Sequence, residues 1–177
     1  GDSATVNGGS YNNSTGVGAS IIGGTSNIAS GINSIAGGEN NTASGDYSVS
    51  IGLNNSATGR NSVVAGGLGN IASGSPFVLG GPVGSIVAGG QNNQATSTFS
   101  VISGGFGNQA SQIYTTVSGG AVNNAVSAYS TIIGGQTNTA NGVLSSILGG
   151  QSNITQGSLS SVTGIGNTSQ SYGEFVG

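Results

Sequence analysis

The sequence predicts an all-β protein, a parallel β-solenoid of about 11 short coils. A pair of glycines recurs at intervals of 14 or 15 residues, with a single longer gap of 23. A Val or Ile stands three residues before the second glycine of each pair, and an Asn stands three residues after it. A unit of this length is too short for helical repeats of about 33 residues, whereas two short strands and two tight turns fill it.

The first strand of each coil is predicted from its β-branched residue. Val and Ile favour strands, and a residue that recurs once per coil occupies the same place in every coil. We therefore expect one aliphatic column facing the core, made of Val6, Ile21, Ile35, Val49, Val64, Val87, Ile102, Val117, Ile132 and Ile147.

The glycine pair predicts the turn that follows, because glycine adopts positive φ without strain. The second strand is predicted from a small residue, usually Ala, two positions after the recurrent Asn. A core only two sheets thick has no room for a large side chain on both strands of each coil. A further glycine often follows two residues later and closes the coil.

The recurrent Asn predicts a ladder of amide groups along the stack. Equivalent residues of neighbouring coils lie about 4.8 Å apart, so their amides can bond one another. We interpret this column as structural, and it consists of Asn12, Asn27, Asn41, Asn55, Asn70, Asn93, Asn108, Asn123, Asn138 and Asn153.

The composition excludes several classes of function. Only five of the 177 residues are charged, the net charge is −3, and His and Cys are absent. Nucleic-acid binding depends on clusters of Lys and Arg, so we expect none, and we also expect no membrane insertion of this segment. Serine nucleophiles lack their usual base, and Glu39 and Asp46 lie half a coil apart. We therefore expect no enzymatic activity, catalytic residue, metal or cofactor.

Residues 48–62, SVSIGLNNSATGRNS, closely resemble the head repeat of YadA-type trimeric autotransporter adhesins. Its pattern is matched by Ser48, Val49, Ile51, Gly52, Ala57, Gly59 and Ser62. The other coils resemble a GGxxN variant of the same repeat, and similar repeats also occur in phage tail fibres and other extracellular fibres. The resemblance implies a left-handed β-roll, a homotrimer and a microbial or virion surface location. It also implies adhesion to host-matrix or cell-surface macromolecules through the polar faces of the roll.

Two other functions fit the same fold. A filament or spacer would need only length and self-association through its exposed strand edges. An ice-binding solenoid would need a regular Thr column, but the column preceding the aliphatic one is mixed, and it includes Ser34, Ser48 and Val63.

We expect one solenoid domain over residues 1–177, with repeat blocks at 4–75 and 84–167, an inserted loop at 76–83 and a terminal segment at 168–177. The loop contains both prolines and an apolar run, so it is a candidate contact site made of Pro76, Phe77, Val78, Leu79 and Pro82. Nine residues after the second glycine of the pair lies a candidate interface stripe, made of Phe99, Tyr114, Tyr129, Leu144 and Leu159. Asp46 and Arg60 are predicted to form a salt bridge between neighbouring coils.

Overall fold

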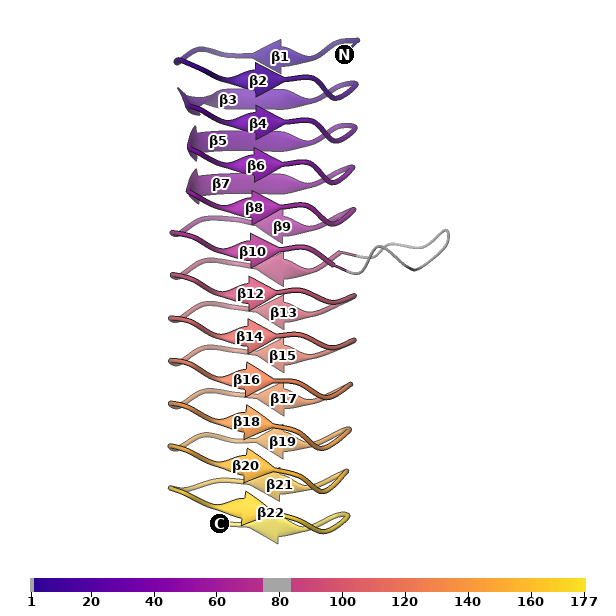
Figure 1. Cartoon of the computed structure of the whole chain (residues 1–177), viewed down its shortest axis with the longest axis vertical. Helices are drawn as coiled ribbons and strands as arrows, with labels where there is room; N and C mark the ends of the chain where they lie inside the picture. The colour runs from indigo at the N-terminus through magenta and orange to yellow at the C-terminus, as the bar shows by residue number, and fades with distance from the viewer. Residues whose placement is uncertain (1, 75–83) are drawn as a thin grey trace.

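The computed structural model describes residues 2–74 and 84–177, which form two parallel β-sheets wound from one continuous coil (Figure 1). Strands of the two sheets alternate along the chain, and each strand pairs with its equivalent in the preceding and following coils. The N-terminus lies at one end of the stack and the C-terminus at the other. The described residues contain no helix. No helical segment in that part of the chain is therefore long and apolar enough to cross a membrane.

We call the sheet of odd-numbered strands sheet A. Its 12 strands are β1 (Thr5–Val6), β3 (Ser20–Thr25), β5 (Ile35–Glu39), β7 (Val49–Leu53), β9 (Val63–Val64), β11 (Ile86–Val87), β13 (Val101–Ile102), β15 (Thr116–Val117), β17 (Thr131–Ile132), β19 (Ser146–Ile147), β21 (Ser161–Val162) and β23 (Phe175–Val176).

The even-numbered strands form sheet B. Its 11 strands are β2 (Asn13–Ser14), β4 (Ile28–Ala29), β6 (Thr42–Ala43), β8 (Ser56–Ala57), β10 (Ile71–Ala72), β12 (Gln94–Ala95), β14 (Gln109–Ala110), β16 (Asn124–Ala125), β18 (Thr139–Ala140), β20 (Ile154–Thr155) and β22 (Thr168–Ser169).

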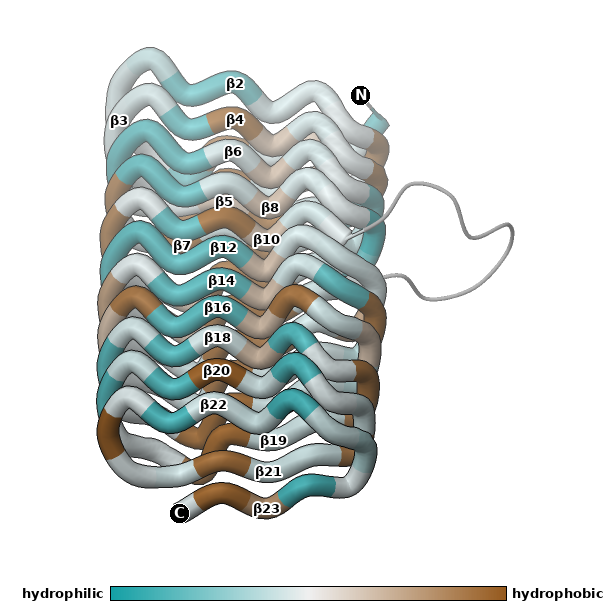
Figure 2. Tube along the Cα trace, turned by 60° about the horizontal axis from the view of Figure 1, so that its bottom comes forward, coloured by the Kyte–Doolittle hydropathy of each residue, from teal (hydrophilic) through white to brown (hydrophobic). Residues whose placement is uncertain are grey.

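The core lies between the sheets and is thin. Sheet A contributes an aliphatic residue in most coils, such as Ile102 and Ile132, and sheet B contributes Ala in most coils, such as Ala110 and Ala140. These side chains are fully buried. Residues of like hydropathy fall into columns along the stack (Figure 2), because every coil repeats the inward and outward positions of its neighbours.

The predicted aliphatic column is wrong in two coils. Ile21 pairs with Ala36, Ala36 with Ser50, and Ser50 with Val64, so Ala36 and Ser50 occupy the core positions. Ile35 and Val49 lie in the outward column of sheet A, and Ile35 is 36% exposed. The cause is a shorter corner: the core residue lies three positions before Gly24 but only two before Gly38 and Gly52. A count from the glycine therefore selects the wrong face of the strand.

Three further positions differ from the expected columns. Val6 is in register with Ile21 but is 46% exposed, because it belongs to the first coil of the stack and no coil covers it on that side. Ser34 and Ser48 are fully buried, so Ile35 and Val49 replace them in the outward column. That column is less regular in hydroxyl groups than the ice-binding alternative requires.

The 23-residue interval does not interrupt either sheet. Val64 pairs directly with Val87 and Ala72 with Ala95, in the same register as in the other coils. The candidate contact loop, with Pro76, Phe77, Val78, Leu79 and Pro82, lies outside the described residues.

Candidate functional site

The Asn column forms a continuous ladder in which every amide group is engaged. In a typical coil, the backbone N–H of Asn108 donates to Oδ1 of Asn93 at 3.0 Å. Its Nδ2 donates to the carbonyl oxygens of Gly104 at 2.9 Å and Gly120 at 3.0 Å. Amide-to-amide bonds also occur in some coils, for example from Asn138 Nδ2 to Asn123 Oδ1 at 3.1 Å. The ladder is buried from Asn27 to Asn153, so it has no free group for a ligand.

A column of buried hydroxyl residues was missed by sequence reasoning, and in three of them, Ser34, Ser48 and Ser130, the hydroxyl group has no hydrogen-bond partner among the described residues. The column lies at the opposite corner of the coil and contains a buried hydroxyl residue just before the outward position of sheet A. Ser100 and Ser160 each donate to a carbonyl three residues earlier, at 2.6 Å, and so close the turn from sheet B to sheet A. Its periodicity is visible in the sequence, but a count from the glycine places two of its members at the surface. The column consists of Ser34, Ser48, Ser62, Ser85, Ser100, Thr115, Ser130, Ser145 and Ser160.

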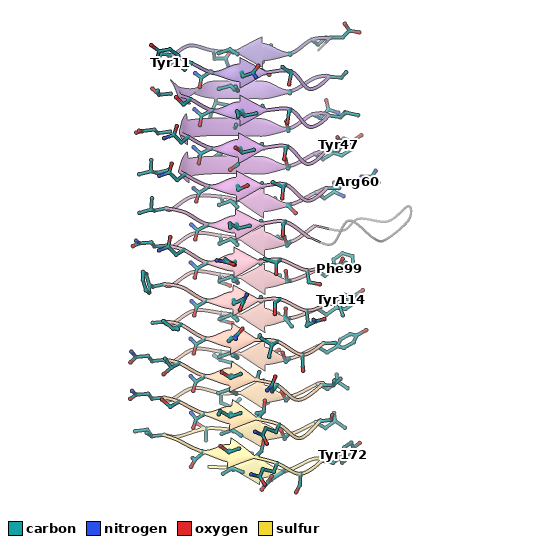
Figure 3. All side chains as sticks on the ribbon, in the orientation of Figure 1. Tyr11, Tyr47, Arg60, Phe99, Tyr114 and Tyr172 are labelled. Carbon is teal, nitrogen blue, oxygen red and sulfur yellow. The ribbon has the colours of Figure 1, made fainter. Side chains whose placement is uncertain are left out.

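The candidate interface stripe forms a ridge along the edge where sheet B turns into sheet A (Figure 3). Ring centroids of Phe99 and Tyr114 lie 5.0 Å apart and those of Tyr114 and Tyr129 lie 5.1 Å apart, with the rings stacked. We call Phe99, Tyr114, Tyr129, Leu144 and Leu159 the ridge; these side chains are 36–52% exposed.

Ridge residues have left-handed backbone conformations, with φ between 56° and 59°. Bulky residues rarely adopt this conformation, whereas Gly and Asn do so more readily. Gly18, Asn33 and Asn61 occupy the equivalent position in N-terminal coils. The turn itself therefore does not require large side chains, and their presence points to a role for the side chains at the surface.

The outer face of sheet A carries a second apolar stripe. Its outward column is aliphatic over five successive coils and then changes to hydroxyl residues. Ile86 is 42% exposed, which is unusual for a large aliphatic residue repeated in register along a sheet. The aliphatic part consists of Ile35, Val49, Val63, Ile86 and Val101, and the hydroxyl part of Thr116, Thr131, Ser146 and Ser161.

The outer face of sheet B is mainly polar and uncharged. Seven successive coils place Ser or Thr at its edge, and none of these hydroxyl groups has a hydrogen-bond partner among the described residues. The groups are thus available to solvent or to a partner. The column consists of Thr15, Ser30, Ser44, Thr58, Ser73, Thr96 and Ser111.

The few charged groups are dispersed. The predicted salt bridge is wrong: Oδ1 of Asp46 accepts a hydrogen bond from the backbone of Ile32 at 2.9 Å, and Arg60 Cζ lies 6.0 Å from the ring centroid of Tyr47. Backbone donors of Ser171 and Gln170 lower the pKa of Glu174 below its usual value. Over residues 2–74 and 84–177, no three acidic, His or Cys residues are grouped closely enough to hold a metal ion.

Comparison with protein families bears directly on the fold. Residues 29–55 and 43–68 match the YadA head domain repeat as two overlapping copies. These residues span the coils with the shorter corner, in which Ile51 stands where other coils have the first glycine. No curated protein matches the chain significantly. Residues 29–68 are therefore similar to YadA head domain repeats, and they lie within a parallel β-solenoid that continues in both directions.

Proposed function

We propose that the chain is a head or fibre segment of an extracellular adhesin, which attaches one surface to another by non-covalent contact and catalyses no reaction. The observation that carries this proposal is the long outer face of sheet B, which is mainly polar and carries no charged residue in its strands. The match to YadA head repeats supports it. The proposed location is a cell or virion surface, and the proposed ligands are host-matrix or cell-surface macromolecules.

Sheet B provides the proposed attachment face. Its hydroxyl column repeats at the strand spacing of about 4.8 Å and has no partner within the described chain. A long array of weak polar contacts gives adhesion through many simultaneous bonds rather than through one deep site.

Binding to immobilised matrix proteins, measured by surface plasmon resonance, tests this proposal. Ser44→Arg combined with Thr58→Arg should abolish binding, because both residues are exposed on sheet B. Gln136→Arg, at the opposite edge of the coil, is the matched control and should leave binding unchanged. Absence of binding by the unmodified chain to every matrix and cell-surface preparation would contradict the adhesin function.

We also propose that the chain associates with itself, as a homotrimer. The apolar stripe of sheet A and the ridge are exposed in a single chain, and burial in an assembly would remove both from water. Light scattering after size-exclusion chromatography should give one mass, three times that of the chain. A mass that grows with concentration would favour the filament alternative, and a monomer would overturn both forms of association.

Residues 76–83 remain a separate proposed contact. Deleting Pro76–Val83 and measuring both mass and matrix binding distinguishes their roles. Loss of the trimer would make the segment an assembly contact, and loss of binding alone would make it an adhesive contact. If neither changes, the proposal fails.

A further inference from the structure

The ridge and the outward column of sheet A are related coil by coil. In each coil the ridge position is followed by one buried residue and then by the outward position, as in Tyr114, Thr115 and Thr116. Both positions are at the surface of the same coil, at the same height along the stack. Their side-chain sizes can therefore be compared directly in every coil.

Large and small residues exchange places between the two columns. From Asn33 to Ile86 a small or polar ridge residue accompanies a large outward residue in most coils, and from Tyr114 to Ser161 the order is reversed. The coils at the two ends differ: Ser3 with Thr5 and Gly18 with Ser20 are small or polar at both positions, and Gly173 with Phe175 again combines a small ridge residue with a large outward one. Two coils, with Tyr47 and Val49 and with Phe99 and Val101, have a large residue at both positions. The first kind comprises Asn33 with Ile35, Asn61 with Val63 and Gly84 with Ile86, and the second Tyr114 with Thr116, Tyr129 with Thr131, Leu144 with Ser146 and Leu159 with Ser161.

This exchange cannot be explained by the fold of one chain. Neither column is buried in it, and the left-handed conformation, which the ridge position adopts in the described coils other than that of Gly84, favours Gly or Asn. A contact between the two columns would explain it, because a large residue on one side then meets a small one on the other. Ridge-to-ridge or face-to-face contact would instead oppose large with large in some coils and small with small in the rest.

We infer that the ridge of one copy packs against the outward column of sheet A of a neighbouring copy, with the two copies parallel and in register at the same coil. This inference rests on the proposed self-association and specifies its geometry. A contact between two different patches is the kind that closes into a ring around a rotation axis. Neither column contains a charged residue from Asn33 to Ser161, so no charge is buried in the contact.

Disulfide trapping tests the geometry cleanly, because the chain has no cysteine. Chains carrying Leu144→Cys are mixed, through unfolding and refolding, with differently tagged chains carrying Ser146→Cys, and mild oxidation follows. The expected product is a covalent dimer containing both tags. A Cβ separation of about 4 Å is needed for the bond, so only chains in register can form it. Leu159→Cys with Ser161→Cys is a second pair, in case the first variant does not fold.

Three controls make the result decisive. Leu144→Cys with Thr116→Cys, two coils out of register, should give no covalent dimer. Cross-linking of Leu144→Cys chains with one another would show ridge-to-ridge contact, and cross-linking of Ser146→Cys chains would show face-to-face contact; either overturns the inference. A trimer by light scattering without cross-linking in either in-register pair rejects this geometry alone, whereas a monomer rejects the proposed association as well.

Discussion

The two glycines of each pair should differ sharply in their tolerance of substitution. Gly105 has a φ of 92°, and a Cβ at this position would overlap the carbonyl oxygen of Gly120 and lie 2.6 Å from Nδ2 of Asn108. A Cβ added to the preceding residue, Gly104, would meet no atom within 4 Å, and the φ of Gly104 lies outside the left-handed region. Gly105→Ala should therefore destabilise the fold strongly, and Gly104→Ala should not.

The magnitude follows from the contacts that must break. A side chain at this φ costs about 1–3 kcal/mol in backbone strain. Moving the next coil away weakens the bonds to Gly120 O from the backbone of Phe106 and from Nδ2 of Asn108, both 3.0 Å long. Each contributes about 1 kcal/mol, so the total loss is about 3–5 kcal/mol. Gly104→Ala should change stability by less than about 1 kcal/mol, since it mainly restricts the unfolded chain.

Urea denaturation followed by far-UV circular dichroism, in the strand region of the spectrum, measures both variants against the unmodified chain. The two substitutions add the same methyl group to neighbouring residues, so their difference isolates the position. Equal losses for Gly104→Ala and Gly105→Ala would refute the reasoning.

Two other predictions concern the core and the response to pH. Ile132 is fully buried, so Ile132→Ala should lower the free energy of unfolding by about 2–5 kcal/mol. The side chain of Ile133 is 52% exposed, so Ile133→Ala should have a much smaller effect in the monomeric state. Urea titrations of the two variants compare these losses. The depressed pKa of Glu174 stabilises the fold above the unfolded-state pKa, and this contribution is lost as the pH falls through the folded-state value. The melting temperature should therefore vary little from about pH 5 to about pH 9 and decline only in stronger acid, below about pH 4; a steep change near neutrality would contradict this.

The sequence was sufficient to predict the architecture because each structural requirement recurs in every coil. The turn needs glycine at one position, the ladder needs Asn, and the sheet B strand needs a small inward residue such as Ala110. Each requirement is local, so one coil gives only a weak signal, but the same residues in phase over many coils leave few alternatives. The parallel register of the two sheets follows directly from that phase.

The face of a strand is harder to predict where the coil length changes. The loss of one residue could fall in either turn or in either strand, and these choices place different residues in the core. In the coils of Gly38 and Gly52 it falls between the core residue and the glycine, which moves Ile35 and Val49 to the surface. Hydrophobicity alone favoured the opposite assignment, since Ala36 and Ser50 are less apolar than the residues beside them. The outward stripe of sheet A, and with it the proposed interface, could therefore be recognised only from the pairing.

The Asn ladder leads to a prediction about hydrogen bonding by the side chain of Asn108. Asn108 uses its Nδ2 as a donor to two carbonyls and its Oδ1 as an acceptor from the backbone of Asn123 at 2.9 Å. Asn108→Ala removes these bonds and leaves the buried N–H of Asn123 without its acceptor, which should cost about 3–5 kcal/mol. Gln109→Ala is the matched control: its side chain lies on the outer face of sheet B and should contribute less than about 0.5 kcal/mol.

Asn108→Asp distinguishes the contribution of the Oδ1 acceptor from that of the Nδ2 donor. It keeps an acceptor for Asn123 but replaces the donor with a second oxygen facing the carbonyls of Gly104 and Gly120. An ionised carboxylate there is buried and repelled by both, so the variant should be less stable than Asn108→Ala at neutral pH. Because the folded state then raises the pKa of this Asp, its protonated form restores a donor, and the variant should regain stability as the pH falls through the raised folded-state pKa towards the unfolded-state value of about 3.9. Thermal melts of both variants from neutral to mildly acidic pH decide the matter. If Asn108→Asp is as stable as the unmodified chain at neutral pH, the side chain of Asn108 is not acting as a donor to those carbonyls.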